Sequence, residues 1–167
     1  MRVASCRLEG RTGHQAGREL LRRLYLEETG QPLPEIEVSS TGKPYFPHSS
    51  FHFSITHTPR HAFCVLARCP VGIDAEELDR PIRPQLADRT LSPSEKQRYL
   101  AAADPNSAFL ALWVQKEAAV KLSGNGLRGF PNGTDFSPEA PWVHRWDGCV
   151  VALFAEDPDE GVTYHAF

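Results

Sequence analysis

The first apolar pattern along the chain has the spacing of an amphipathic helix. Its apolar positions share one helical face: Ala16, Leu20, Leu21 and Leu24. Thr12 and Gln15 form the pattern of a capping box at the start, and Gly30 is a residue suited to the end. The pattern therefore predicts a helix over His14–Thr29.

Beyond residues 31–34 the apolar period changes to that of β-strands. The alternating positions are Ile36, Val38, Phe51, Phe53 and Ile55. Alternation with polar residues is typical of half-buried strands. Two further short strands are expected over Ala62–Ala67 and Val71–Ala75, joined by a turn at residues 68–70.

The middle of the chain carries two helical signals. Residues 92–95 read Ser-Pro-Ser-Glu, which gives an N-cap, a proline at the first helical position and a capping glutamate, and predicts a helix to about Ala103. Asp104 and Pro105 begin a longer helix. It is expected to reach Leu122 and to end at Gly124.

The last third returns to short segments rich in β-branched and aromatic residues. Strands are expected over Val143–Trp146, Cys149–Phe154 and Val162–Phe167, separated by a turn at residues 147–148 and an acidic turn at residues 156–161. The order of helix, strands, helices and strands predicts an α+β fold and not the alternation of a doubly wound sheet.

Length and composition fit one compact unit without a nucleic-acid or membrane partner. The chain has 167 residues, 41% of them hydrophobic, which is enough to bury one sizeable core. Eighteen basic and 21 acidic residues give a net charge of -3, so no overall basic field indicates nucleic acid. The arginine-containing start does not resemble a secretory signal, and the longest apolar run, Cys149–Ala155, is far shorter than a membrane span. A cytoplasmic protein is the expectation.

Cysteines and most histidines show no motif of their own. The four cysteines, at positions 6, 64, 69 and 149, lack paired C-x-x-C spacing, so four reduced and mostly buried thiols are expected, with a zinc site or a disulfide as the alternative. Histidines at positions 14, 48, 52, 61, 144 and 165 show no ligand spacing, which favours surface or structural roles.

Asp74 and Glu76 are the first candidates for a functional site. In a strand these two carboxylates point to the same face, and Ala75 points the other way into the core. Carboxylates this close repel unless a cation lies between them, and Mg²⁺ takes oxygen ligands of this kind. Glu117 supplies a third carboxylate if the long helix packs beside the end of the strand.

The long helix presents Trp113, Glu117 and Lys121 on one face, because they are four residues apart. Simpler interpretations exist for both elements. Glu76, Glu77 and Asp79 could belong to a solvated acidic turn, and a Lys-Glu pair on a helix is usually a surface salt bridge. The occurrence of both elements in one chain favours a metal site.

Five segments resemble motifs of one enzyme family. Gly72–Glu76 (GIDAE) and Trp113–Lys121 (WVQKEAAVK) resemble the two signature motifs of 4'-phosphopantetheinyl transferases. Gly42–Pro44 (GKP) and Phe53–Thr58 (FSITHT) resemble two further motifs of the surfactin-synthetase-activating type, and Gly124–Leu127 (GNGL) resembles the glycine-rich exit after the second signature. Their order and spacing also agree with that family.

The resemblance implies a fold and a reaction. The fold is α+β, with two pseudo-symmetric α/β halves in one chain, here expected over residues 1–75 and 76–167, and a coenzyme A site in the cleft between them. The reaction transfers the 4'-phosphopantetheine arm of coenzyme A to a serine of an apo acyl or peptidyl carrier protein and releases adenosine 3',5'-bisphosphate. The chain is shorter at both ends than surfactin-type relatives, which leaves open whether the first half has strands to close over the adenine.

Roles for individual residues follow from the matched motifs. Asp74, Glu76 and Glu117 are implied to hold Mg²⁺ against the pyrophosphate of coenzyme A, with Mn²⁺ as the alternative ion. Lys121 is implied to lie near the reacting centre. Glu117 is the preferred general base and Lys121 the second choice, since an ammonium must first lose its proton to accept one.

Further cations and hydroxyls are expected around the coenzyme. His57 and Lys43 are implied to contact its phosphates, although a histidine at a strand end and a lysine in an exposed loop are the simpler interpretations. Thr56 offers a hydroxyl to anionic oxygens or to the turn backbone. Arg11, ahead of the first helix, is a candidate for the 3'-phosphate.

The partner surface is expected over Leu78–Leu100, because this segment combines apolar residues with arginine and lysine, which suit an acidic carrier protein. An ordinary mobile connection containing three prolines is the alternative. A monomer is expected from two halves in one chain. Two other functions remain open: a relative without catalytic activity that binds coenzyme A or a carrier protein, and a magnesium-dependent hydrolase of pyrophosphates. The first would be marked by the loss of a carboxylate or of Lys121, and the second would need its own positioned water.

Overall fold

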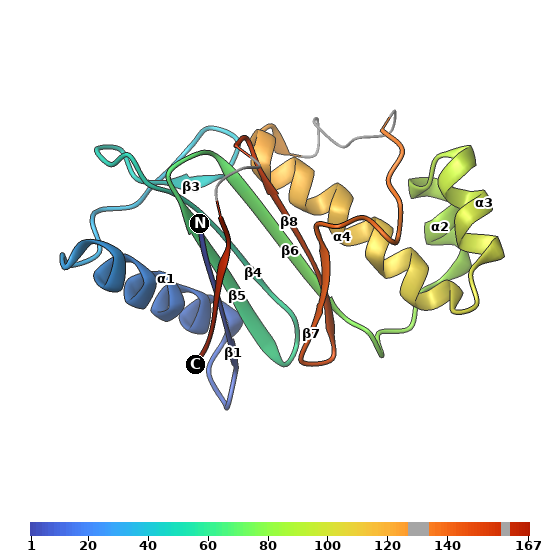
Figure 1. Ribbon diagram of the computed structural model, residues 1–167, viewed down its shortest axis with the longest axis horizontal. Coiled ribbons are helices and arrows are strands. Elements are labelled where there is room, and N and C mark those ends of the chain that lie inside the picture. Colours follow the sequence, from blue (N-terminus) through green and yellow to red (C-terminus); the bar gives the residue numbers. More distant parts are fainter. Residues whose placement is uncertain (127–133, 158–160) are drawn as a thin grey trace.

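Two β-sheets form the centre of the fold in a computed structural model that describes residues 1–126, 134–157 and 161–167. The first sheet has the order β4-β5-β1-β9. Its strands are β1 (Arg2–Arg7), β4 (His52–His57), β5 (His61–Ala67) and β9 (Thr163–Ala166). β1 pairs antiparallel with β5 and parallel with β9, so the first and last strands of the chain lie side by side (Figure 1).

The second sheet is antiparallel, with the order β6-β8-β7. It consists of β6 (Val71–Glu77), β7 (Val143–Trp146) and β8 (Cys149–Ala155). A short hairpin of β2 (Glu37–Val38) and β3 (Pro44–Tyr45) stands apart from both sheets. The mixture of helices and sheets confirms the predicted α+β class.

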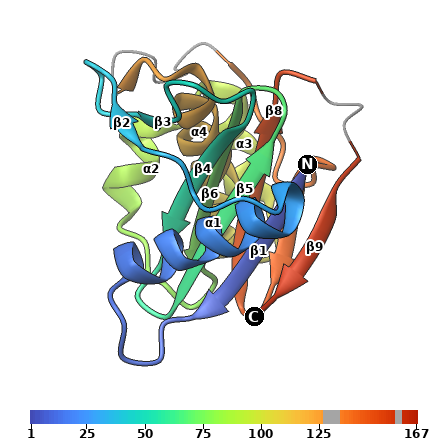
Figure 2. The same cartoon turned by 90° about the vertical axis from the view of Figure 1, so that its left-hand side faces the viewer.

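Helix α1 (Gly13–Thr29) covers the first sheet (Figure 2). The predicted capping box of Thr12 and Gln15 is present, and Gly30 ends the helix in the left-handed conformation with φ 68°. The predicted apolar face is buried against β1, β4 and β5. Local signals therefore placed this helix to within one residue.

Helix α4 (Pro105–Ser123) packs on β6 and β8 of the second sheet. Asp104 caps its start, and Gly124 ends it with φ 67°, both as predicted. The shorter α3 (Pro93–Ala101) begins with the predicted capping box. Leu127, the last residue of the GNGL segment, lies outside the described residues.

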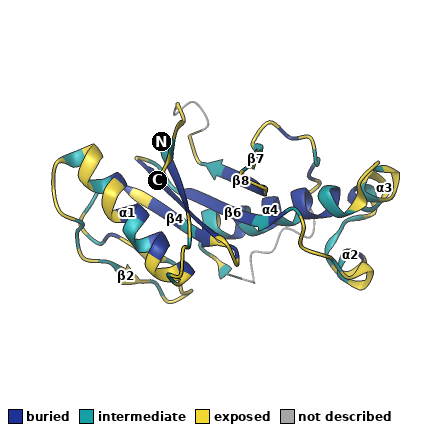
Figure 3. Cartoon of the chain, turned by 90° about the horizontal axis from the view of Figure 1, so that it is seen from below, coloured by how far each residue is buried: buried dark blue, intermediate teal, exposed yellow. Residues whose placement is uncertain are grey.

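The core is arranged in layers. One face of the first sheet packs on α1, its other face packs against the second sheet, and the far face of the second sheet packs on α4. Buried positions accordingly follow the inward faces of the helices and strands (Figure 3). Val71, Ile73 and Ala75 point to the layer between the sheets, which confirms the inward direction predicted for Ala75.

Three elements differ from the sequence prediction. β1 and the short β3 form where no strand was expected, and α2 (Pro84–Thr90) forms within the proline-containing connection after β6. All four central residues of β1 are buried, so it shows no alternation. α2 lacks a side-chain cap at Arg83.

Within the described residues, no helix has both the length and the apolar character needed to cross a bilayer.

Candidate active site

Strand β6 and helix α4 touch at Gly72. A Cβ atom on Gly72 would lie 2.1 Å from the carbonyl oxygen of Ala118 and 2.5 Å from the backbone nitrogen of Leu122. Only glycine permits this approach of strand and helix backbones. The contact brings the acidic end of β6 beside the helix face that carries Glu117 and Lys121.

Asp74 is the anchor of the site. Its side chain is buried, and its Oδ1 atom accepts hydrogen bonds from Lys121 Nζ at 2.7 Å and from Thr56 Oγ1 at 2.9 Å. Three elements, β4, β6 and α4, therefore converge on one carboxylate. Both bonds fall on Oδ1, so among the described residues Oδ2 is the oxygen of Asp74 that remains available to a cation.

Glu76 and Glu117 are half-buried, and both are affected by the negative charge of Asp74. Burial raises the pKa of the Glu76 carboxyl, and the charges of Asp74 and Glu117 raise it further, whereas Arg80 and Lys121 act in the opposite direction. Burial also raises the pKa of Glu117, with a further contribution from Asp74. Because neighbouring carboxylates disfavour the charged forms of Glu76 and Glu117, a cation bound among them would be stabilised.

The three carboxyl groups do not form a tight cluster by themselves. In the part of the chain that the structure describes, the group of ligand atoms found within 4.8 Å of one another is a different one, made by His61, Glu77 and Cys149. Glu76 instead forms an ion pair with Arg80, and Asp74 pairs with Lys121. The donor set fits Mg²⁺, since it consists of carboxylate oxygens, but protein cations contact two of the three groups.

Lys43 lies at the rim of a cavity of about 250 Å³ between the β2–β3 hairpin, β4 and the end of α4. Its Nζ donates a hydrogen bond to the carbonyl oxygen of Leu122 at 2.9 Å. Burial lowers the pKa of Lys43. Lys121 lines the same cavity, so two of the expected cations meet there. The interpretation of Lys43 as an ordinary exposed loop lysine is wrong.

His57 and Arg11 lie near the start of α1. His57 ends β4, and its imidazole ring packs against Gly13. A Cβ atom added to Gly13 would lie 2.3 Å from the ring. Arg11 donates hydrogen bonds to the carbonyl oxygens of Leu8 at 3.1 Å and Arg7 at 2.8 Å. The Arg11 guanidinium therefore braces the loop between β1 and α1.

A buried ion pair beside the site was not foreseen from the sequence. Lys116 and Glu95 are both fully buried, with Lys116 Nζ 2.9 Å from Glu95 Oε2. The carboxylate also accepts hydrogen bonds from the backbone nitrogens of Ser92 and Phe136. The simpler interpretation of a Lys-Glu pair on this helix, a surface salt bridge, does not describe Lys116, whose partner is on α3. The capping-box glutamate at position 95 was the available signal.

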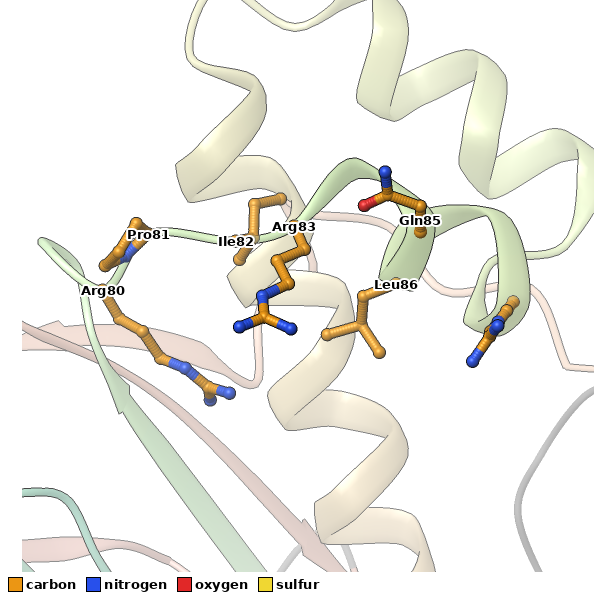
Figure 4. A pocket seen from close by; sticks show the side chains of 7 residues that line it. Arg80, Pro81, Ile82, Arg83, Gln85 and Leu86 are labelled. Atoms are coloured by element: carbon orange, nitrogen blue, oxygen red, sulfur yellow. The ribbon is translucent and has the colours of Figure 1, made fainter.

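A basic groove follows β6. It has a volume of about 630 Å³ and is lined by Arg80, Pro81, Ile82, Arg83, Gln85, Leu86 and Arg89. The side chains of Arg80, Arg83 and Leu86 extend to the same side of the segment (Figure 4). The ion pair of Arg80 with Glu76 connects this groove to the carboxylates.

The comparison with family models covers this site. Residues 70–148 match the model described as 4'-phosphopantetheinyl transferase superfamily. The matched region contains β6, α4 and the basic groove. Asp74, Glu76, Glu117 and Lys121 all fall within it.

Curated relatives agree with that match. The chain is 35% identical over 116 residues to the 4'-phosphopantetheinyl transferase psf-1 of Bacillus pumilus. The aligned region covers 66% of this chain and 49% of the relative. It is 37% identical over 94 residues to a 4'-phosphopantetheinyl transferase of Bacillus subtilis (54% and 41% covered). It is 33% identical over 132 residues to the 4'-phosphopantetheinyl transferase HetI of Nostoc (71% and 54% covered). The chain belongs to the 4'-phosphopantetheinyl transferase family, and it spans about half the length of the relatives it matches.

Proposed function

We propose that this chain transfers the 4'-phosphopantetheine arm of coenzyme A to a serine of an apo acyl or peptidyl carrier protein. The observation that carries the proposal is the contact of β6 with α4 at Gly72, where Lys121 bonds to Asp74 and where the charges of Asp74 and Glu117 act on Glu76. The relatives bearing the transferase name support it. A relative without catalytic activity is not favoured, because all three carboxylates and Lys121 are retained.

In the proposed reaction, the serine hydroxyl oxygen attacks the phosphorus that bears the pantetheine arm. The bond from that phosphorus to the bridging oxygen breaks, and adenosine 3',5'-bisphosphate leaves. Asp74, Glu76 and Glu117 would hold Mg²⁺, or Mn²⁺ as the alternative. When bound, the ion supplies neutralisation of negative charge on the pyrophosphate. Thr56 and Lys121 hold Asp74 in place for this task.

We assign the role of general base to Glu117. Its pKa is raised by burial and by Asp74, which makes the carboxylate a better proton acceptor than an exposed glutamate. Lys121 is the weaker choice, because its Nζ already donates to Asp74 at 2.7 Å and would have to lose that proton. Lys121 is better placed to offset negative charge near the reacting phosphate.

Coenzyme A is proposed to lie between two halves of the chain, residues 1–75 and 76–167, that are related by pseudo-symmetry. The packing of α1 on the first sheet and of α4 on the second supports two halves. The boundary at residue 75 falls within β6 of the second sheet, however, and β9 returns to the first sheet. His57 and Lys43 would contact the phosphates, with Thr56 beside them. Arg11 would have to release its loop carbonyls to reach the 3'-phosphate.

The carrier protein is proposed to dock on the basic groove. Arg83 and Arg89 offer positive charge to an acidic partner, and Ile82 and Leu86 offer apolar contact beside it. The groove adjoins Glu76 through Arg80, so a docked carrier would present its serine near the carboxylates. We propose that a monomer performs this reaction in the cytoplasm.

The experiment is to incubate the chain with coenzyme A, Mg²⁺ and a panel of apo acyl and peptidyl carriers, and to weigh each carrier by mass spectrometry. A carrier gains the mass of the arm if the proposal is right. Glu117→Gln should lower turnover at least about 100-fold, the scale of a lost general base. Glu139→Gln, the same change at an exposed position, is the control and should leave turnover intact. No mass gain on any carrier would refute transfer, and a fully active Glu117→Gln would remove Glu117 from its role.

A further inference from the structure

A second cluster of ligand-type side chains lies on the other side of β6 from Glu76. His61 begins β5, Glu77 ends β6 and Cys149 begins β8. Their exposed fractions are 5%, 3% and 0%, and their ligand atoms all lie within 4.8 Å of one another. The sequence allowed Glu77 to be part of a solvated acidic turn, and its burial shows that this interpretation is wrong. The transfer mechanism uses none of these three residues.

The spacing of the three ligand atoms suits a tetrahedral ion. His61 Nδ1 is 3.1 Å from Glu77 Oε1 and 3.4 Å from Cys149 Sγ. Zinc bonds of about 2.0 Å to nitrogen or oxygen and about 2.3 Å to sulfur place tetrahedral ligands roughly 3.3–3.6 Å apart. The two distances from His61 lie within a few tenths of an ångström of this range, and Glu77 and Cys149 lie within 4.8 Å of each other.

Two of the three ligands, His61 and Glu77, are oriented by neighbours outside the cluster. His61 Nε2 lies 3.1 Å from Asp147 Oδ2, and Arg7 donates to the same carboxylate at 2.9 and 3.1 Å. A hydrogen bond from Nε2–H to Asp147 fixes the tautomer in which Nδ1 presents its lone pair to the cluster. Arg60 holds Glu77 Oε2 at 2.6 Å, which turns Oε1 inward. Carboxylates behind ligating histidines are the usual support of zinc sites.

The chemistry of the ligands favours zinc over magnesium. Thiolate and imidazole are softer ligands than the carboxylates of the site at Asp74, and Zn²⁺ prefers them. One thiolate and one carboxylate also balance the two charges of the ion, which makes its burial acceptable. The Thr58 hydroxyl donates to Glu77 Oε1, which places it beside the cluster.

We propose that His61, Glu77 and Cys149 form a zinc-binding centre, with the hydroxyl of Thr58 or a water as the fourth ligand. The ligands come from β5 of the first sheet and from β6 and β8 of the second. The centre therefore ties the two sheets together at the edge of the layer between them. Its role is structural, and it is independent of the transfer reaction.

The test is the metal content of the full chain purified without chelators and loaded with zinc. One zinc per chain is expected, with loss of it in Cys149→Ala and in His61→Ala. Cys64→Ala removes another fully buried thiol, which belongs to no such cluster among the residues that the structure describes, and this variant should keep the metal. Equal zinc in the Cys149→Ala and wild-type chains would overturn the proposal.

Two measurements on cobalt and on the wild type complete the test. Co²⁺ should give a thiolate charge-transfer band that persists in Asp74→Asn, because the oxygen site lacks sulfur. X-ray absorption of the zinc-loaded wild type should show one sulfur at about 2.3 Å, which needs no variant to fold. A shell of oxygen and nitrogen alone, or no bound zinc, would refute the centre. None of these readouts depends on transfer activity.

Discussion

Replacing Lys116 by methionine tests the buried ion pair between α3 and α4. The change keeps most of the length of the side chain but removes its charge. Among the described residues, the donors that then remain to the fully buried Glu95 carboxylate are the backbone nitrogens of Ser92 and Phe136. Breaking a buried pair by removing one partner costs about 3–5 kcal/mol. Because two donors remain, we expect the lower end, about 3 kcal/mol, from a total of about 5–15 kcal/mol for a protein domain.

Urea unfolding followed by tryptophan fluorescence measures this loss. With a slope of about 2 kcal/mol per molar urea, the midpoint should fall by about 1.5 M. Lys96→Met is the matched control. Lys96 pairs with Asp88 at the surface, where both side chains are about half exposed, so its loss should cost at most about 1 kcal/mol.

The double variant Lys116→Met with Glu95→Gln separates the charge from the packing. Since it leaves no buried charge, it should be more stable than Lys116→Met alone, which a double-mutant cycle would report as a coupling free energy. A Lys116→Met chain within about 0.5 kcal/mol of wild type would show that the pair does not hold α3 to α4. A double variant no more stable than the single one would refute the argument from unpaired charge.

Three further outcomes are expected. Gly72→Ala should destabilise the chain by about 2 kcal/mol or more in urea unfolding, because the added methyl meets the backbone of α4, whereas Gly161→Ala, with open space around it, should not. Thr56→Val keeps the side-chain shape but removes a donor to Asp74, so the Mg²⁺ concentration for half-maximal transfer should change severalfold, and an unchanged value would contradict this role. The pKa of Glu19 is lowered to about 2 by its hydrogen bonds to arginines on α1, so its contribution to stability is full above about pH 4.5 and is lost as the pH falls toward 2. Glu19→Gln should lack this small contribution when the chain is unfolded by acid. An acid-unfolding curve identical to that of the wild type would count against this role of Glu19.

Helices were predictable where their ends are marked by nearby residues. The capping boxes at Thr12 and Ser92 and the glycine at position 124 each act within one turn, so the sequence alone places α1, α3 and the end of α4. β1 had no such mark. It pairs with strands about sixty and one hundred and sixty residues away, and burial on both faces removes the alternation that identifies a strand.

The candidate site was predictable only in part, because some of its contacts join residues that are far apart in the sequence. Asp74 and Glu76 share a face because of strand geometry, and Glu117 and Lys121 share one because of helix geometry, so each pair follows from local rules. The contact of Thr56 with Asp74 and the pairing of Glu76 with Arg80 depend on how the side chains pack in three dimensions. Lys116 shows the limit clearly, since its partner Glu95 is twenty-one residues back along the chain.

The two faces of β6 carry different groups, and their separation depends on the pairing of β6 with β8. Asp74 and Glu76 face α4, whereas Ala75 and Glu77 face the layer between the sheets. Inserting or deleting one residue early in this strand would exchange the two sets and would push carboxylates into an apolar layer. Substitutions can change this segment gradually, but a change in its length cannot be tolerated, so homologous chains should vary in the loops on either side of β6 and never within it.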